Sequence, residues 1–193
     1  MGVLSSLYHG LCRVNSVLLL GGRQLAWMCV ALMTLIILLQ VFYRYILNDA
    51  LPWPEEAARA LMIWMTALAA PTAYRYGGFV SIDMLQDYLP PILKSVLSIT
   101  LLVLAGVVLI KLLELAIQFF GRGFRTSTAS IYLPWDPAEK LKRAWVYLAM
   151  PVCFGGMLLV NLELLLREAG VAFGDPDAFP APVKPVALSG AES

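Results

Sequence analysis

Long runs of apolar residues constrain the fold of this chain more than any other feature of its sequence. A helix needs about 20 apolar residues to cross the hydrocarbon core of a bilayer. The apolar runs predict spans at about residues 25–43, 57–74, 92–118 and 144–162. The composition agrees, because only 14% of the residues are charged and 60% are hydrophobic, whereas a soluble domain carries about 25% charged residues.

The sequence therefore predicts an all-α membrane protein with four transmembrane helices plus interfacial amphipathic helix segments. Residues 1–23 mix Leu, Val and Tyr with Arg13 and Arg23, which favours a helix lying at the membrane surface. The first run is too long for the apolar region of a signal peptide, and Arg44 and Tyr45 follow it instead of a cleavage site. We expect a membrane domain over residues 1–168 and a disordered tail over residues 169–193, which is rich in Pro, Ala and Gly.

The sequence lacks the residues that several kinds of active site and metal site need. His9 is the only histidine, so axial haem ligands and a histidine base within a span are missing. Cys12, Cys29 and Cys153 are far apart, and the HExxH zinc motif is absent. We expect no enzyme, no cofactor and no metal. A net charge of +1 without a basic block also makes nucleic acid an unexpected partner.

The start of the second span holds a dense polar cluster, and two interpretations remain open. Pro54 suits the first position of a helix, and Glu55 and Glu56 then fall in its first turn, where the helix dipole favours anions. Glu55 and Arg59 are spaced to pair, and Trp53 suits the aromatic belt. The cluster is either a local helix-start device or an edge at the membrane surface that docks a partner.

Further features mark the later spans. We expect Pro71 to kink or end the second span, and Gly77-Gly78 to form a turn after it. Lys111 and Glu114 are three apart in the third helix and can pair. Pro151 and Gly155-Gly156 in the fourth span either allow another helix to approach closely or bend this one.

The segment Phe42–Leu85 resembles the small membrane subunit, of DctQ type, of tripartite ATP-independent periplasmic (TRAP) transporters. That family typically has an aromatic-Arg-Tyr at the end of its first span, then Pro-Trp-x-Glu-Glu-x-x-Arg, a Trp, and Arg-x-Gly-Gly before an Asp. Here the matching residues are Arg44, Tyr45, Pro52, Trp53, Glu55, Glu56, Arg59, Trp64, Arg75, Gly77, Gly78 and Asp83. The sequence departs from the pattern at Pro71 and at Phe79, where the family often has histidine.

The resemblance implies a subunit of a sodium-coupled transporter for organic acids in the bacterial inner membrane. The implied partners are a large TRAP membrane subunit, which holds the solute and sodium sites, and a periplasmic substrate-binding protein. The small subunit would pack against the large one, contact membrane lipids, and help to dock the binding protein. The matched residues would serve as docking or structural motifs.

The orientation of the chain has conflicting indications. Eight Lys and Arg residues fall in the first and third connectors and six in the other connectors and the ends, which by the positive-inside rule favours external termini. The resemblance implies cytoplasmic termini, and we follow it. An alternative from another class is an orphan four-span membrane scaffold or sensor protein, which would lack genes for a large permease and a binding protein beside its own.

Overall fold

The computed structural model describes residues 2–49, 51–77, 91–132, 140–173 and 180. Long helices dominate it, namely α1 (Gly2–Tyr45), α2 (Pro54–Gly77), α4 (Pro91–Gly123) and α6 (Ala149–Phe173). A short helix α5 (Ala144–Tyr147) precedes α6, and two strands, β1 (Ser127–Tyr132) and β2 (Lys140–Lys142), lie between α4 and α5. These elements confirm the expectation of a largely helical membrane protein.

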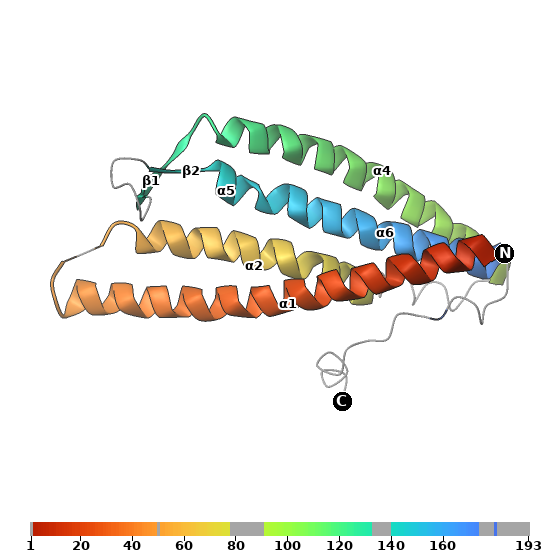
Figure 1. The fold of residues 1–193 in the computed structure, drawn as a ribbon, viewed down its shortest axis with the longest axis horizontal. Coiled ribbons are helices and arrows are strands. Elements are labelled where there is room, and N and C mark those ends of the chain that lie inside the picture. The colour runs from red at the N-terminus through yellow and green to blue at the C-terminus, as the bar shows by residue number, and fades with distance from the viewer. Residues whose placement is uncertain (1, 50, 78–90, 133–139, 174–179, 181–193) are drawn as a thin grey trace.

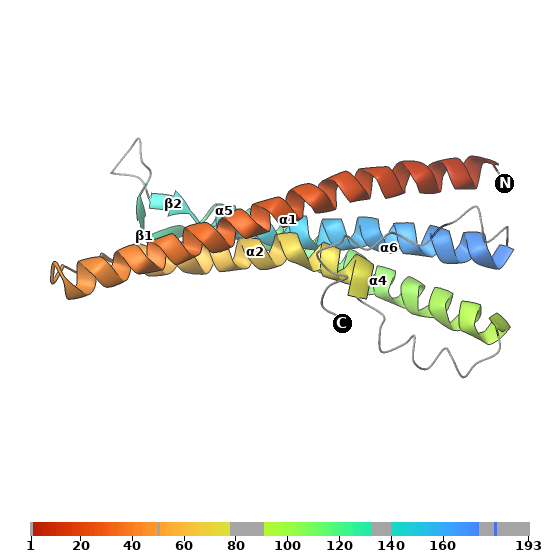
Figure 2. The same cartoon turned by 90° about the horizontal axis from the view of Figure 1, so that it is seen from below.

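The long helices form an elongated bundle in which α2 packs against α1 and α6, and α6 packs against α4 (Figure 1). The start of α1, the start of α4 and the end of α6 lie at one end of the bundle, which we call the terminal end (Figures 1 and 2). The strands lie at the other end, which we call the hairpin end. Buried Leu19, Leu102, Val160 and Leu164 form a small apolar core.

Three helical stretches are long and apolar enough to cross a membrane, namely Ser6–Tyr45, Ser95–Gly123 and Ala144–Val171. The expected fourth span, at residues 57–74, corresponds to α2 but is not confirmed. Helix α2 is the least apolar of the long helices. A helix that packs between two others can carry more polar residues, because fewer of its side chains meet lipid.

The first helix corrects one expectation. Residues 1–23 were expected to form a separate interfacial segment before a span at 25–43, but α1 is one helix of 44 residues. At 1.5 Å per residue it is about 66 Å long. Its first half is held in the bundle because Asn15 and Leu19 are buried and a side chain at Gly22 would lie 3.2 Å from the Leu68 carbonyl oxygen.

Other boundaries also differ from the expected ones. Pro71 lies inside α2, which continues to Gly77 instead of ending there. Helix α6 extends to Phe173, so residues 169–173 belong to it and not to a tail. Of the rest of the expected tail, only Pro180 is among the described residues. The connector before α5 contains an antiparallel pair of strands, with Ser127 opposite Lys142, which the pattern of apolar runs does not predict.

Glycines set the closest helix contacts. A Cβ on Gly156 would lie 2.8 Å from Cγ of Pro71, and one on Gly123 would lie 2.7 Å from Cα of Ala144. The expected close approach at Gly155-Gly156 is therefore confirmed at Gly156, where α6 meets α2. These contacts also fix which stretches share a layer: Gly123 with Ala144, and Gly156 with Pro71.

Candidate functional site

The polar cluster predicted at the start of the second span begins α2 at the hairpin end. Pro54 is the first residue of the helix and is buried, and Glu55 and Glu56 lie in the first turn. The predicted pair between Glu55 and Arg59 is confirmed at 2.9 Å, with both side chains largely exposed. Trp53 is half-buried and its carbonyl accepts a hydrogen bond from the Ala57 amide. The cluster thus caps the helix locally and leaves its charges accessible.

The other motif residues do not gather around that cluster. Arg44 and Tyr45 end α1, where the guanidinium lies 5.9 Å from the centre of the Tyr45 ring and both side chains are exposed. Pro52 is exposed in the turn before α2, and Trp64 is half-buried in the helix. Gly77 is the last residue of α2, while Gly78 and Asp83 lie outside the described residues.

Arg75 has a different environment from the rest of the motif. Its guanidinium forms an ion pair with Glu163 of α6, and both side chains are 1% exposed. Nδ2 of Asn15, on α1, donates a hydrogen bond of 2.6 Å to the other carboxylate oxygen of Glu163. Three helices therefore meet through Asn15, Arg75 and Glu163, which we call the buried polar cluster.

The first helix supplies further partners to Arg75. Nη1 donates to Oγ of Ser16 at 3.0 Å, and Nη2 lies 3.3 Å from Sγ of Cys12. Asn15 also donates to the Leu159 carbonyl at 3.1 Å. A buried charge is tolerated when it is paired and hydrogen-bonded. The charged groups of the buried polar cluster thus pair with each other, and the cluster joins α1, α2 and α6 near the terminal end.

A second polar contact lies beside the first. The hydroxyl of Tyr74 donates to Oδ1 of Asn161 at 2.8 Å, and Nδ2 of Asn161 donates to the Leu102 carbonyl at 3.2 Å. A Cβ on Gly106 would lie 2.8 Å from that Nδ2. Asn161 therefore links α2 to α4, and α4 can approach because position 106 has no side chain.

Sequence reasoning placed Arg75 in a turn motif and did not identify Asn15, Asn161 or Glu163 as site residues. The signal that could have found them is the presence of polar residues within otherwise apolar stretches, since polar groups at membrane depth are usually paired or functional. Arg23, expected in an interfacial segment, is half-buried in α1 next to Gly22, and its Nη1 has no partner within the described part of the chain.

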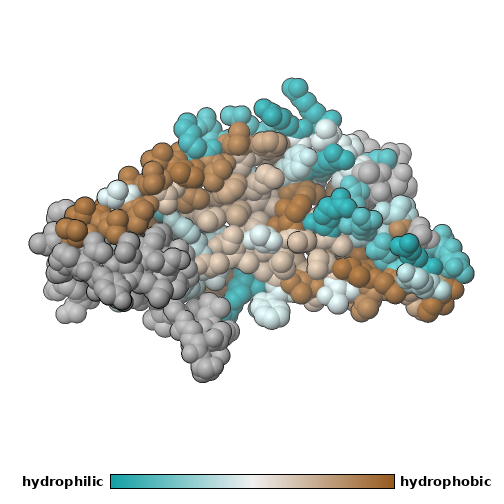
Figure 3. Space-filling view, turned by 180° about the vertical axis from the view of Figure 1, so that it is seen from behind, coloured by the Kyte–Doolittle hydropathy of each residue, from teal (hydrophilic) through white to brown (hydrophobic). Residues whose placement is uncertain are grey.

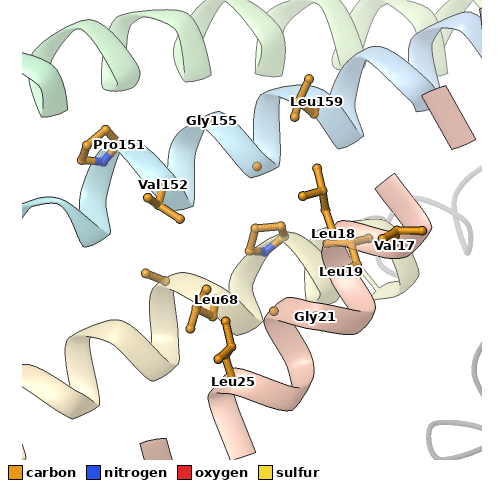
Figure 4. A pocket seen from close by; sticks show the side chains of 14 residues that line it. Val17, Leu18, Leu19, Gly21, Leu25, Leu68, Pro151, Val152, Gly155 and Leu159 are labelled. Carbon is orange, nitrogen blue, oxygen red and sulfur yellow. The ribbon is translucent and has the colours of Figure 1, made fainter. Parts of the chain in front are cut away.

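A groove of about 490 Å³ lies between α1, α2 and α6. Figure 4 shows Leu18 and Leu25 on one wall, Pro151 and Leu159 on the opposite wall, and Leu68 from α2. The lining is almost entirely apolar, so the groove offers no charged group to a solute. In the described ranges, no three His, Cys, Asp or Glu side chains gather as they would around a metal ion.

Sequence comparison gives this arrangement a family. The family described as "Tripartite ATP-independent periplasmic transporters, DctQ component" matches residues 33–170. The chain belongs to this family. The match begins within α1, so in this DctQ chain Arg75 and Glu163 lie inside the family segment, whereas Asn15 and its neighbours on α1 precede it.

Two curated relatives agree with the DctQ assignment. The chain is 32% identical over 150 residues to the isethionate TRAP transporter permease protein DctMQ of Oleidesulfovibrio alaskensis, a match that covers 71% of this chain and 22% of that protein. It is 35% identical over 68 residues to a protein named as a TRAP transporter small permease of Haemophilus influenzae, covering 35% of this chain and 42% of that one. The DctQ chain thus spans less than half the length of each relative in these matches.

Proposed function

We propose that this chain is the small permease subunit of a sodium-coupled, binding-protein-dependent TRAP transporter for organic acids, and that it packs against and stabilises the large transport subunit. The observation that carries this proposal is the DctQ family match over residues 33–170, which includes residues of all four long helices. The relative named DctMQ supports it, because this chain matches only 22% of that permease protein. The remainder of such a permease leaves room for a larger transport part.

The interior of the helix bundle, as far as its residues are described, supports a stabilising role rather than a carrier role. A site for an organic acid needs cationic or hydrogen-bonding groups that are free to face the solute. Here Arg75 is bound by Glu163 and by groups of α1, and the groove between α1, α2 and α6 is apolar. The solute and sodium sites belong to the large subunit in this proposal.

The exposed cluster at the start of α2 is the proposed docking edge. Glu55 and Arg59 form a pair with both side chains more than two-thirds exposed. Such a pair contributes little to the stability of the isolated chain, because water solvates both charges. It can instead meet a partner at the membrane surface, either the large subunit or the periplasmic binding protein. We place the chain in the bacterial inner membrane with cytoplasmic termini.

Co-purification tests the association. A tagged copy of this chain, co-expressed with a large TRAP membrane subunit from the same genome, is expected to retain that subunit through detergent extraction and size-exclusion chromatography. A matched tagged four-span protein from another family is the control. Recovery of the large subunit at the level of that control would contradict the proposal.

A further inference from the structure

The outer face of α4 changes character along its length. Towards the terminal end it exposes Val96, Val103 and Val107. From Lys111 onward, polar residues recur at helical spacing on one side, and all are exposed. We call these residues the α4 polar stripe: Lys111, Glu114, Gln118, Arg122 and Arg125, of which the last lies two residues beyond the end of the helix.

Helix contacts place the α4 polar stripe at the depth of an apolar part of α1. The part of the stripe that lies on α4, from Lys111 to Arg122, falls between the Gly106–Asn161 contact and the Gly123–Ala144 contact. It is therefore level with residues between 144 and 161 of α5 and α6. In that layer α6 meets α2 at Gly156 and Pro71, and α2 meets α1 at Leu68 and Gly22. On α1 the same layer exposes Leu25 (51%), Trp27 (68%) and Met28 (61%).

One layer of the bundle thus has an apolar outer side on α1 and a polar outer side on α4. Figure 3 shows hydrophilic colour over the middle of the upper edge of the bundle, where Figure 1 places α4, and hydrophobic colour further along that edge towards the terminal end. Lipid tails can cover the apolar side chains on the outer side of α1. They do not suit Lys111 and Glu114, because charges facing hydrocarbon are costly. Moving the layer out of the membrane would instead expose Trp27 and Met28 to water.

The charges of the stripe are only partly satisfied within the described residues. Lys111 pairs with Glu114 at 3.0 Å. Arg122 lies over the ring of Phe119 at 5.4 Å, but neither it nor Arg125 has an acidic partner in the described part of the chain. Both arginines line a hollow of about 340 Å³ together with Gln118 and Gly121. The stripe is therefore net positive, and its two arginines lie beside this hollow without an acidic partner among the described residues.

We propose that the α4 polar stripe is the surface on which the large permease subunit docks, and that this subunit presents carboxylates or other hydrogen-bond acceptors to Arg122 and Arg125 and a polar side chain to the Lys111–Glu114 pair. This proposal rests on the function proposed above. Because the stripe is charged, a protein partner suits it better than lipid tails. The outer side of α1 in the same layer is apolar, so we assign that side to the lipid. A buried interface of this kind satisfies donors that lipid tails cannot satisfy.

Site-specific photo-cross-linking in the intact complex tests the face. A benzophenone amino acid is placed at Gln118, and a matched control is placed at Met28, which is exposed in the same layer on α1. The expected result is a covalent adduct with the large subunit from position 118 and only lipid adducts from position 28. Adducts with the large subunit from position 28 and none from position 118 would overturn the proposed face.

Charge reversal provides a second readout. Arg122→Glu/Arg125→Glu is expected to lower recovery of the large subunit about tenfold, the size expected for losing charge-assisted hydrogen bonds. Arg13→Glu, an exposed charge on α1, is the matched control and is expected to leave recovery unchanged. Unchanged recovery of the large subunit by the double variant would contradict the proposal. The thermal stability of the isolated double variant in detergent serves as the control that it folds.

The two proposals fail differently. If wild-type chain retains the large subunit but neither cross-linking nor charge reversal involves the α4 polar stripe, the docking face is wrong and the subunit role stands. If wild-type chain does not retain the large subunit at all, the subunit role fails and the docking face fails with it.

Discussion

Arg75 and Glu163 share a buried contact between two helices, and the energetics of such pairs are asymmetric. Removing one partner leaves an uncompensated buried charge, which costs about 3–5 kcal/mol, whereas replacing both partners by apolar side chains is often neutral. Asn15 and Ser16 add hydrogen bonds to the same two groups. The cluster therefore acts as a specific joint between α1, α2 and α6.

Glu163→Ala is expected to destabilise the detergent-solubilised chain by about 3–5 kcal/mol, because Arg75 remains buried without its carboxylate. The double variant Arg75→Met/Glu163→Leu is expected to regain most of that loss. Thermal unfolding followed by fluorescence measures both. A double variant no more stable than Glu163→Ala would show that the charge is not the cause.

Adjacent glycines in α6 give a second residue-level prediction. Gly156→Ala is expected to destabilise the chain by about 1–3 kcal/mol, because overpacking forces the helices apart where the new Cβ would lie 2.8 Å from the rigid ring of Pro71. Gly155→Ala is the matched control, since a Cβ there has no neighbour within 4 Å. It is expected to be neutral or to stabilise the helix by up to about 1 kcal/mol. Equal effects at the two positions would contradict the packing at Gly156.

Spacing in the sequence identified the pairs that lie on one helix. Glu55 with Arg59 and Lys111 with Glu114 follow from helical periodicity, and both are present in the structure. The pair between Arg75 and Glu163 could not be found in this way, because 88 positions separate its members and no local rule connects them. Their contact follows only from the packing of α2 beside α6.

At the scale of elements, the existence of the long helices was predictable and their ends were not. The apolar runs gave the centres of α1, α4 and α6. The extension of α1 to Gly2 was not predicted, because the contacts of Asn15 and Gly22 that hold its first half against other helices are not visible in the sequence. The strand pair at Ser127 and Lys142 depends on the meeting of Gly123 and Ala144, which a linear reading does not reveal.

Variants at the start of α2 can distinguish a local role of the polar cluster from a docking role. Glu55→Ala removes a first-turn anion and the partner of Arg59, and in the isolated chain it is expected to cost less than about 1.5 kcal/mol. If the cluster also meets a partner, Glu55→Ala/Arg59→Ala lowers the yield and thermal stability of the complex beyond this local effect. Co-purification with the large subunit measures the difference. An unchanged complex would leave only the helix-start role.

At the scale of the whole molecule, the start of α1 and the end of α6 lie at the same end of the bundle (Figure 1). The orientation proposed above puts that end in the cytoplasm, whereas the distribution of Lys and Arg weakly favours the opposite. A reporter fused after Ser193 is therefore expected to be active only as a cytoplasmic reporter, with fusions in the connector around Asp136 as the opposite control. Activity of the Ser193 fusion only as a periplasmic reporter would reverse the orientation.

Reconstituted transport tests the subunit role most directly. Proteoliposomes that contain this chain alone are expected to show no sodium-driven uptake of an organic acid, because its buried charges bind one another and its groove is apolar. Vesicles with this chain, the large subunit and the loaded binding protein are expected to show uptake that is lost when this chain is left out. Uptake by the chain alone, or full uptake without it, would contradict its role as a required subunit that carries no solute itself.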